Sequence, residues 1–183
     1  MTQDLRVQKT QAAIRHAFWA LLATRPLTKI TISDLIAEAG VGKATFYHHY
    51  VDKFDLARQL CQACEAPLLQ ECAARIASQQ RKALWAPLPR TVLQNATHLR
   101  LATAIRTPEF NGQTALIEQL AALFQQALDA HDPTCWQASG VALELATLYE
   151  HILMVNLLND PKHPPIVAMA ALQQAGTVLF AKG

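Results

Sequence analysis

Residues 31–53 read T-I-S-D-L-I-A-E-A-G-V-G-K-A-T-F-Y-H-H-Y-V-D-K, and this stretch decides how the N-terminal part of the chain should fold. Thr31, with Asp34 three residues later, has the form of a capping box, which predicts that a short helix begins at the next residue. Gly40 is suited to end that helix, because glycine enters the left-handed region without steric cost. We therefore expect a short helix over 32–39.

A second short helix is expected across a tight, glycine-containing turn, from about residue 43 to residue 50. Two short helices joined in this way are the elements of a helix-turn-helix. Apolar residues at helical spacing predict a longer helix before them, over 5–24, which Pro26 ends. A fourth helix should start near Lys53.

The second short helix predicts a surface that reads DNA. At about 100° per residue, Phe46 and Tyr50 fall on one face, where they should pack against the neighbouring helices. The opposite arc carries a cation, a small residue, a phenol and an imidazole, which are Lys43, Ala44, Tyr47 and His48. Lysine can reach guanine acceptors, a small residue allows close approach, and ring contacts read thymine, so this mixture is suited to the major groove.

Polar residues at the edges of this arc are expected to hold phosphate oxygens. They are Thr45 and His49 on the same helix, with Lys53 at the start of the next one. The charge distribution points the same way. Residues 1–53 carry seven Lys/Arg against four Asp/Glu, or +3, whereas the remaining residues carry nine against ten, or −1. An anionic partner should therefore be attracted to the N-terminal part.

These residues resemble the DNA-binding domain of the tetracycline-repressor (TetR/AcrR) family. The resemblance covers residues 8–56, and Gly42 departs from it, since serine is usual there and caps a helix better. The positions that match the family pattern are Thr31, Ile36-Ala37, Ala39-Gly40-Val41, Thr45-Phe46-Tyr47, His49-Tyr50, Lys53 and Leu56.

The resemblance implies an all-helical homodimer whose third helix enters the major groove and whose C-terminal domain binds a small molecule that releases it from DNA. It assigns base reading to Lys43, Ala44, Tyr47 and His48, and phosphate contacts to Thr45, His49 and Lys53, with Thr31 as a further candidate for a backbone contact.

The whole chain is expected to be all-α, with an N-terminal three-helix helix-turn-helix DNA-binding domain over 1–55 and a helical ligand-binding and dimerisation domain over 56–183. No convincing alternation of apolar and polar residues predicts a strand. Prolines separate further candidate helices, and we expect Pro67 to interrupt the fourth helix. The candidates are 68–83, 90–106, 112–131, 134–158 and 164–181.

The last two of these helices predict a homodimer. Apolar residues make up 51% of the chain and charged residues 16%, so the chain should hide more surface than one small core can. Residues 141–158 are nearly apolar all round, which predicts burial on every side. Helices 134–158 and 164–181 are therefore expected to form a four-helix bundle with their symmetry mates. The alternative is that they form a monomer core alone.

A small-molecule effector should bind among the middle helices, although nothing indicates its charge. Each candidate is an aromatic, histidine or methionine residue that could equally belong to the core or an interface: Trp85, His98, Phe110, Trp136, Tyr149, His151 and Met154. The two histidines would be tested first, because an imidazole in an apolar helix needs a partner.

The alternative function is a metal- or redox-sensing regulator that uses Cys61, Cys64 and Cys72. Against it, cysteines on a helix are more often buried free thiols that bind no metal. An enzyme is not expected, because the chain has no nucleophile elbow, phosphate loop or metal-binding histidine pair. No cofactor or bound metal is expected either. With no apolar run of about 18 residues and no signal-peptide pattern, we expect a cytoplasmic protein without a membrane span.

Overall fold

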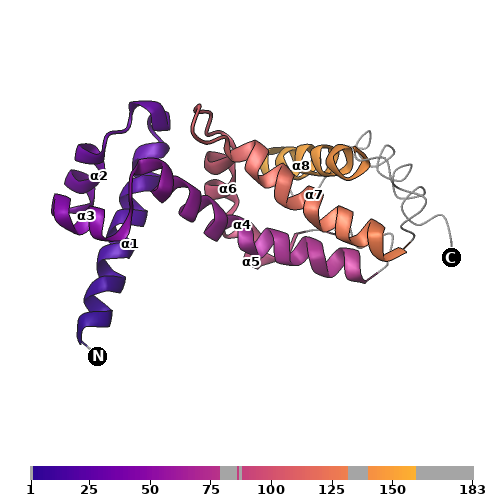
Figure 1. Ribbon diagram of the computed structural model, residues 1–183, viewed down its shortest axis with the longest axis horizontal. Helices are drawn as coiled ribbons and strands as arrows, with labels where there is room; N and C mark the ends of the chain where they lie inside the picture. The colour runs from indigo at the N-terminus through magenta and orange to yellow at the C-terminus, as the bar shows by residue number, and fades with distance from the viewer. Residues whose placement is uncertain (1, 79–85, 87, 132–139, 160–183) are drawn as a thin grey trace. The chain divides into compact units, whose positions relative to one another are not determined.

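The chain is helical in the part that the computed structural model describes, which comprises residues 2–78, 86, 88–131 and 140–159 (Figure 1). The predicted all-α fold is confirmed. An isolated β-bridge joins Arg106 to Asn111. None of the described helices is both long and apolar enough to cross a membrane.

Two compact units divide the chain. The N-terminal unit comprises Met1–Cys64 together with Leu101–Gln113, and the second unit comprises Glu65–Arg100 together with Thr114–Gly183. The boundary that the sequence places after residue 55 stays a prediction.

The N-terminal unit contains the expected helix-turn-helix. Its second helix has the predicted bounds, 32–39, and its first helix begins and ends earlier than the predicted 5–24. In chain order, the elements are α1 (Thr2–Leu22), the 3-10 turn η1 (Leu27–Lys29), α2 (Ile32–Ala39), α3 (Lys43–His49) and the start of α4 (Lys53–Ala77).

A reciprocal capping box fixes the start of α2. The Asp34 amide donates to Thr31 Oγ1 at 3.1 Å, and the Thr31 amide donates to Asp34 Oδ2 at 2.8 Å. The hydrogen bond from the Thr31 backbone holds the pKa of the Asp34 carboxyl below its ordinary value. At the other end, Gly40 has φ 63°, a left-handed conformation in which glycine carries no Cβ penalty. The predicted cap residues therefore explain both ends of this helix.

Buried apolar side chains from each helix hold this unit together. Ile14 and Phe18 of α1, Leu35 of α2, Phe46 of α3 and Leu56 of α4 have no exposed surface. Short helices such as α2 and α3 are unstable alone, so their stability has to come from this shared core.

The fourth helix corrects the prediction that Pro67 interrupts it. α4 runs unbroken over Lys53–Ala77 with Pro67 inside, so no separate helix begins at residue 68. A proline in a helix interior costs about 3 kcal/mol because it lacks one hydrogen-bond donor and crowds the preceding turn. Cys64 and Leu68 flank the proline, and both are buried. Burial of this kind offsets the local penalty, which sequence position alone does not reveal.

The predicted helix 90–106 is also wrong in its extent. The structure has two shorter helices there, α5 (Arg90–Leu93) and α6 (Ala96–Thr103). Between them the Asn95 amide donates to the Val92 carbonyl, three residues back, instead of the carbonyl four residues back. This local change in the hydrogen-bonding pattern separates the two helices.

The second unit includes two long helices, α7 (Gly112–His131) and α8 (Val141–Asn159). The predicted bounds of 112–131 are confirmed. α8 begins at Val141, directly after a turn at Gly140, where the sequence predicts helix. Residues 134–139 of that predicted helix and the helix predicted over 164–181 lie outside the described residues. α7 buries a row of side chains four residues apart, namely Leu116, Leu120, Phe124 and Leu128.

One face of α8 is buried against the rest of the second unit. Ala146, Tyr149 and Leu153 lie on it, and the ring of Tyr149 meets that of Phe124 edge-on at 5.7 Å. Leu143, in contrast, is 50% exposed. Burial on every side of this helix, as the sequence predicts, would therefore require a partner.

Glu65 is a carboxyl group in the core of the second unit. It has no exposed surface, its Oε2 accepts a hydrogen bond from Gln119 Nε2 at 2.8 Å, and its Oε1 has no partner among the described residues. Burial raises the pKa of this carboxyl above its ordinary value. The charged form is therefore disfavoured in the folded protein.

Substituting Glu65→Gln should stabilise the protein at neutral pH. Because the folded pKa lies above the unfolded one, the wild type should lose stability as pH rises through the folded pKa. The variant should lack this loss and gain about 1 kcal/mol or more in free energy of unfolding at pH 7. Urea unfolding at pH 4 and pH 7 measures the gain in stability and its pH dependence. Glu118→Gln, at an exposed position on α7, is the control. Equal pH dependence in wild type and Glu65→Gln would contradict the prediction.

Candidate nucleic-acid interface

The faces of α3 are divided as the sequence predicts. Phe46 is fully buried and Tyr50 is 7% exposed, whereas Tyr47 between them is 47% exposed. The Phe46 ring lies 5.6 Å from that of Tyr47 and 5.7 Å from that of Tyr50, centroid to centroid. The remaining members of the predicted arc, Lys43, Ala44 and His48, are exposed.

This arrangement gives α3 a rigid base and a free outer surface. The helix is seven residues long and is anchored by Phe46 and by Tyr50 at its C-terminal end, while its outer side chains take no part in the core. An exposed cation, methyl group, phenol and imidazole are available to a partner. Their contacts with DNA stay a prediction.

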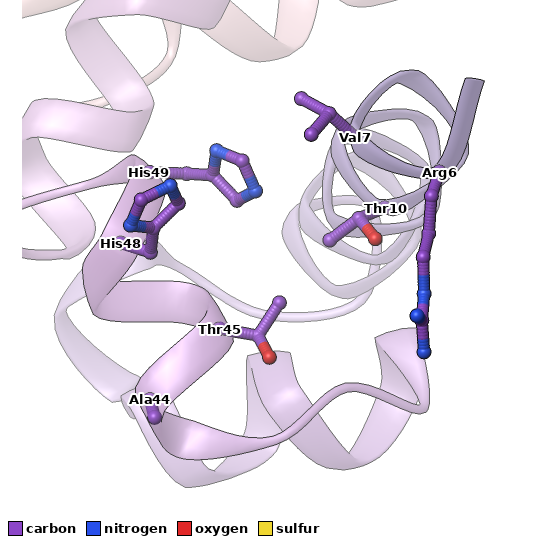
Figure 2. Close-up of a pocket in the computed structure, with 7 residues that line it drawn as sticks. All are labelled: Arg6, Val7, Thr10, Ala44, Thr45, His48 and His49. Atoms are coloured by element: carbon purple, nitrogen blue, oxygen red, sulfur yellow. The ribbon is translucent and has the colours of Figure 1, made fainter. Parts of the chain in front are cut away.

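A hollow of about 450 Å³ lies between α3 and the N-terminal turns of α1 (Figure 2). Figure 2 shows Val7 and Thr10 on one side of it and Thr45 and His49 on the other. The full lining is Arg6, Val7, Thr10, Ala44, Thr45, His48 and His49. No carboxylate is among these residues.

Sequence reasoning identified the α3 side of this hollow and missed the α1 side. Arg6 and Thr10 are four residues apart, which places them on the same side of a helix. That spacing was visible in the sequence. Which side of α1 faces α3 depends on tertiary packing, and no local signal gave it.

Lys53 has structural partners that the sequence did not predict. Its ammonium group donates to the carbonyls of Leu27 at 3.0 Å, Ile30 at 2.7 Å and Thr28 at 3.4 Å. An ammonium has three donors, so these bonds account for all of them. Lys53 therefore ties the start of α4 to η1, and its predicted phosphate contact would have to compete with these carbonyls.

Thr31 is similarly engaged. Besides accepting from the Asp34 amide, its hydroxyl donates to Asp34 Oδ2 at 2.8 Å. The side chain thus serves the cap of α2, and its predicted contact with the DNA backbone remains untested.

The candidate effector residues are distributed over the two units and the segments outside the described residues. Trp85 and Trp136 lie outside the described residues. Phe110 belongs to the segment 101–113 of the N-terminal unit, whereas the other four belong to the second unit. Of those four, Tyr149 is buried, His98 and Met154 are partly exposed, and His151 is exposed.

Two of these residues have defined surroundings. Tyr149 Oη accepts a hydrogen bond from Cys72 Sγ at 3.7 Å, and burial raises the pKa of the tyrosine. Partial burial lowers the pKa of His98, which favours its neutral form. Neither observation identifies an effector, so the whole set stays a prediction.

The three cysteines on α4 are buried thiols, as the ordinary reading expected. Cys64 Sγ donates to the Cys61 carbonyl at 3.2 Å. Burial raises the pKa of the Cys72 thiol to about 11, so the metal-binding thiolate is disfavoured. Across the described residues, no group of three or more His, Cys, Asp or Glu side chains could hold a metal ion. The metal- or redox-sensing alternative is therefore not favoured.

The chain is similar to known proteins in its N-terminal part. Residues 14–60 match the family model described as bacterial regulatory proteins, tetR family. A Bacillus subtilis (strain 168) protein, the uncharacterized HTH-type transcriptional regulator YxbF, is 36% identical over 67 residues. That match covers 36% of this chain and 18% of the relative, so the chain spans less than a fifth of the relative's length.

Among solved structures, a gamma-butyrolactone receptor (ArpA-like protein) aligns with 98% of this chain and 100% of its own. The sequence identity is 20% and the TM-score is 0.39.

Proposed function

Because the chain belongs, through residues 14–60, to the tetR family of bacterial regulatory proteins, we propose that it is a ligand-responsive transcriptional regulator. It acts as a dimer, most simply as a repressor, binds a pseudo-palindromic operator and is released by a small molecule. Its place of action is the cytoplasm, where the DNA is.

The observation that carries this proposal is the division of α3 into a buried and an exposed side. Phe46 is fully buried, and its neighbour Tyr47 is 47% exposed next to exposed Lys43, Ala44 and His48. A recognition helix needs both properties, because its base must be fixed while its outer side chains reach base edges.

A dimer supports this function because one short recognition helix contacts few base pairs. Two copies related by a twofold axis read two half-sites about one helical turn apart, which raises both affinity and specificity. Half-exposed Leu143 on α8 supports a partner surface on that helix. We propose that α8 and the segment 164–181 form the interface.

The effector is proposed to bind in the second unit, as the sequence prediction has it. The described candidates there differ in burial, with Tyr149 buried and His151 exposed. Their chemistry, a phenol and imidazoles beside apolar side chains, is compatible with a small aromatic or apolar molecule.

The function is tested by selecting duplexes from a random pool with the full chain and then comparing wild type with Tyr47→Ala. A base contact contributes about 1–3 kcal/mol of discrimination, so the variant should bind the selected duplex about tenfold more weakly. Its affinity for a scrambled duplex should not change. Fluorescence anisotropy at fixed salt measures both.

The control is Gln62→Ala, an exposed position on α4 in the same unit, which should bind like the wild type. If the wild type enriches no sequence, the proposed function is wrong. If it enriches one and Tyr47→Ala binds it with wild-type affinity, the assignment of Tyr47 to base reading is wrong.

A further inference from the structure

The hollow between α1 and α3 offers donors and a positive charge on a surface open to solvent. Arg6 is exposed, and among the described residues it makes no ion pair or hydrogen bond. Thr10 and Thr45 contribute hydroxyl groups, and His49 contributes a ring nitrogen (Figure 2). A small-molecule pocket would be enclosed. This hollow is open to solvent, and its guanidinium, hydroxyl and imidazole groups are suited to an anion.

We propose that this hollow holds a backbone phosphate of the same duplex whose groove α3 reads, with Arg6 as its charged contact. The inference rests on the proposed DNA-binding function and extends the DNA contact surface from α3 to α1. An arginine is well suited to this role, because its planar fork donates two parallel hydrogen bonds to phosphate oxygens.

Because α1 is packed in the same unit as α3, this contact should orient the protein on the duplex as well as add affinity. Ile14 and Phe18 of α1 are fully buried, as is Phe46 of α3, so both helices are held in the same compact unit. The phosphate site and the base-reading arc are then fixed at one distance from each other. Phosphate contacts of this kind set the register and orientation of a protein on the duplex.

Salt dependence distinguishes a true phosphate contact from a general effect of charge. Each neutralised phosphate releases counterions, and this contributes about 0.9 to the slope of log affinity against log salt concentration. Arg6→Gln should therefore reduce the slope by about 0.9. At low salt it should weaken binding about threefold or more, and by the same factor for the selected and the scrambled duplex.

Lys9→Gln is the matched control. Lys9 is exposed on the same helix, one turn from Arg6, and does not line the hollow. Its substitution removes the same charge from a side chain outside the hollow. Because no phosphate is expected there, the slope should stay close to that of the wild type. Thr10→Val, which removes a hydroxyl without changing shape, should weaken both duplexes less than Arg6→Gln does. Circular dichroism checks that every variant is folded.

Each outcome decides between the alternatives. A wild-type slope in Arg6→Gln, or equal changes in Arg6→Gln and Lys9→Gln, overturns the inference while the DNA-binding function stands. A wild type that binds no duplex overturns both. Titration with inorganic phosphate in the absence of DNA tests a site for a free anion, and saturable binding that Arg6→Gln abolishes would overturn the assignment to the DNA backbone.

Discussion

Phe46→Ala should lower the free energy of unfolding of the N-terminal unit by about 3–5 kcal/mol, the range for truncating a buried phenylalanine. Phe46 has no exposed surface, and its ring lies 5.7 Å from that of Tyr50, centroid to centroid. The substitution removes the main anchor of a helix of seven residues, which is far too short to be stable alone. α3 should therefore detach from the core or unfold.

The adjacent position provides the control. Tyr47 is half-exposed and outside the core, so Tyr47→Ala should change the free energy of unfolding by about 0.5 kcal/mol or less. Urea unfolding followed by circular dichroism compares the two variants. An unfolding midpoint for Phe46→Ala close to that of Tyr47→Ala would show that α3 does not depend on Phe46.

This pair of positions also shows how much the sequence could predict. The spacing of Phe46 and Tyr50 sorts the residues of α3 into a buried and an exposed side, and the structure has the same division. The ends of α2 were equally predictable, because a capping box and a glycine act within a few residues of each other. Local chemistry decides both features.

Features that depend on distant residues could not be predicted in this way. Lys53 reads as a free cation in the sequence, yet its ammonium group bonds to carbonyls of Leu27 and Ile30, more than twenty residues earlier. Similarly, the local penalty of Pro67 is real, but the helix continues through it. For Lys53 a tertiary contact outweighs the local preference, and for Pro67 the helix continues between buried Cys64 and Leu68.

Arg6 illustrates the same limit within the candidate site. Its charge and position are plain in the sequence, but nothing there says that it lines a hollow beside α3. The hollow that it shares with His49 exists only once α1 and α3 are packed. Sequence patterns therefore found the helix-turn-helix and not the surface beside it.

Gly112→Ala should be nearly as damaging as Phe46→Ala, by a different mechanism. A Cβ at Gly112 would lie 1.9 Å from the carbonyl oxygen of Ala102 and 2.8 Å from its carbonyl carbon. Both are backbone atoms, so no side chain can rotate to make room. The Gly112 amide also donates to the Ile105 carbonyl at 3.1 Å, which closes the loop between α6 and α7. We expect a loss of about 3 kcal/mol, the upper part of the range for overpacking.

Gly140→Ala is the matched substitution, because a Cβ there meets no atom within 4 Å. It should change the free energy of unfolding by about 0.5 kcal/mol or less. Because Leu101–Gln113 belongs to the same compact unit as α3, Gly112→Ala should lower the midpoint of the transition that also responds to Phe46→Ala. A shift confined to a different transition, or none, would mean that this loop is not a structural part of the N-terminal unit.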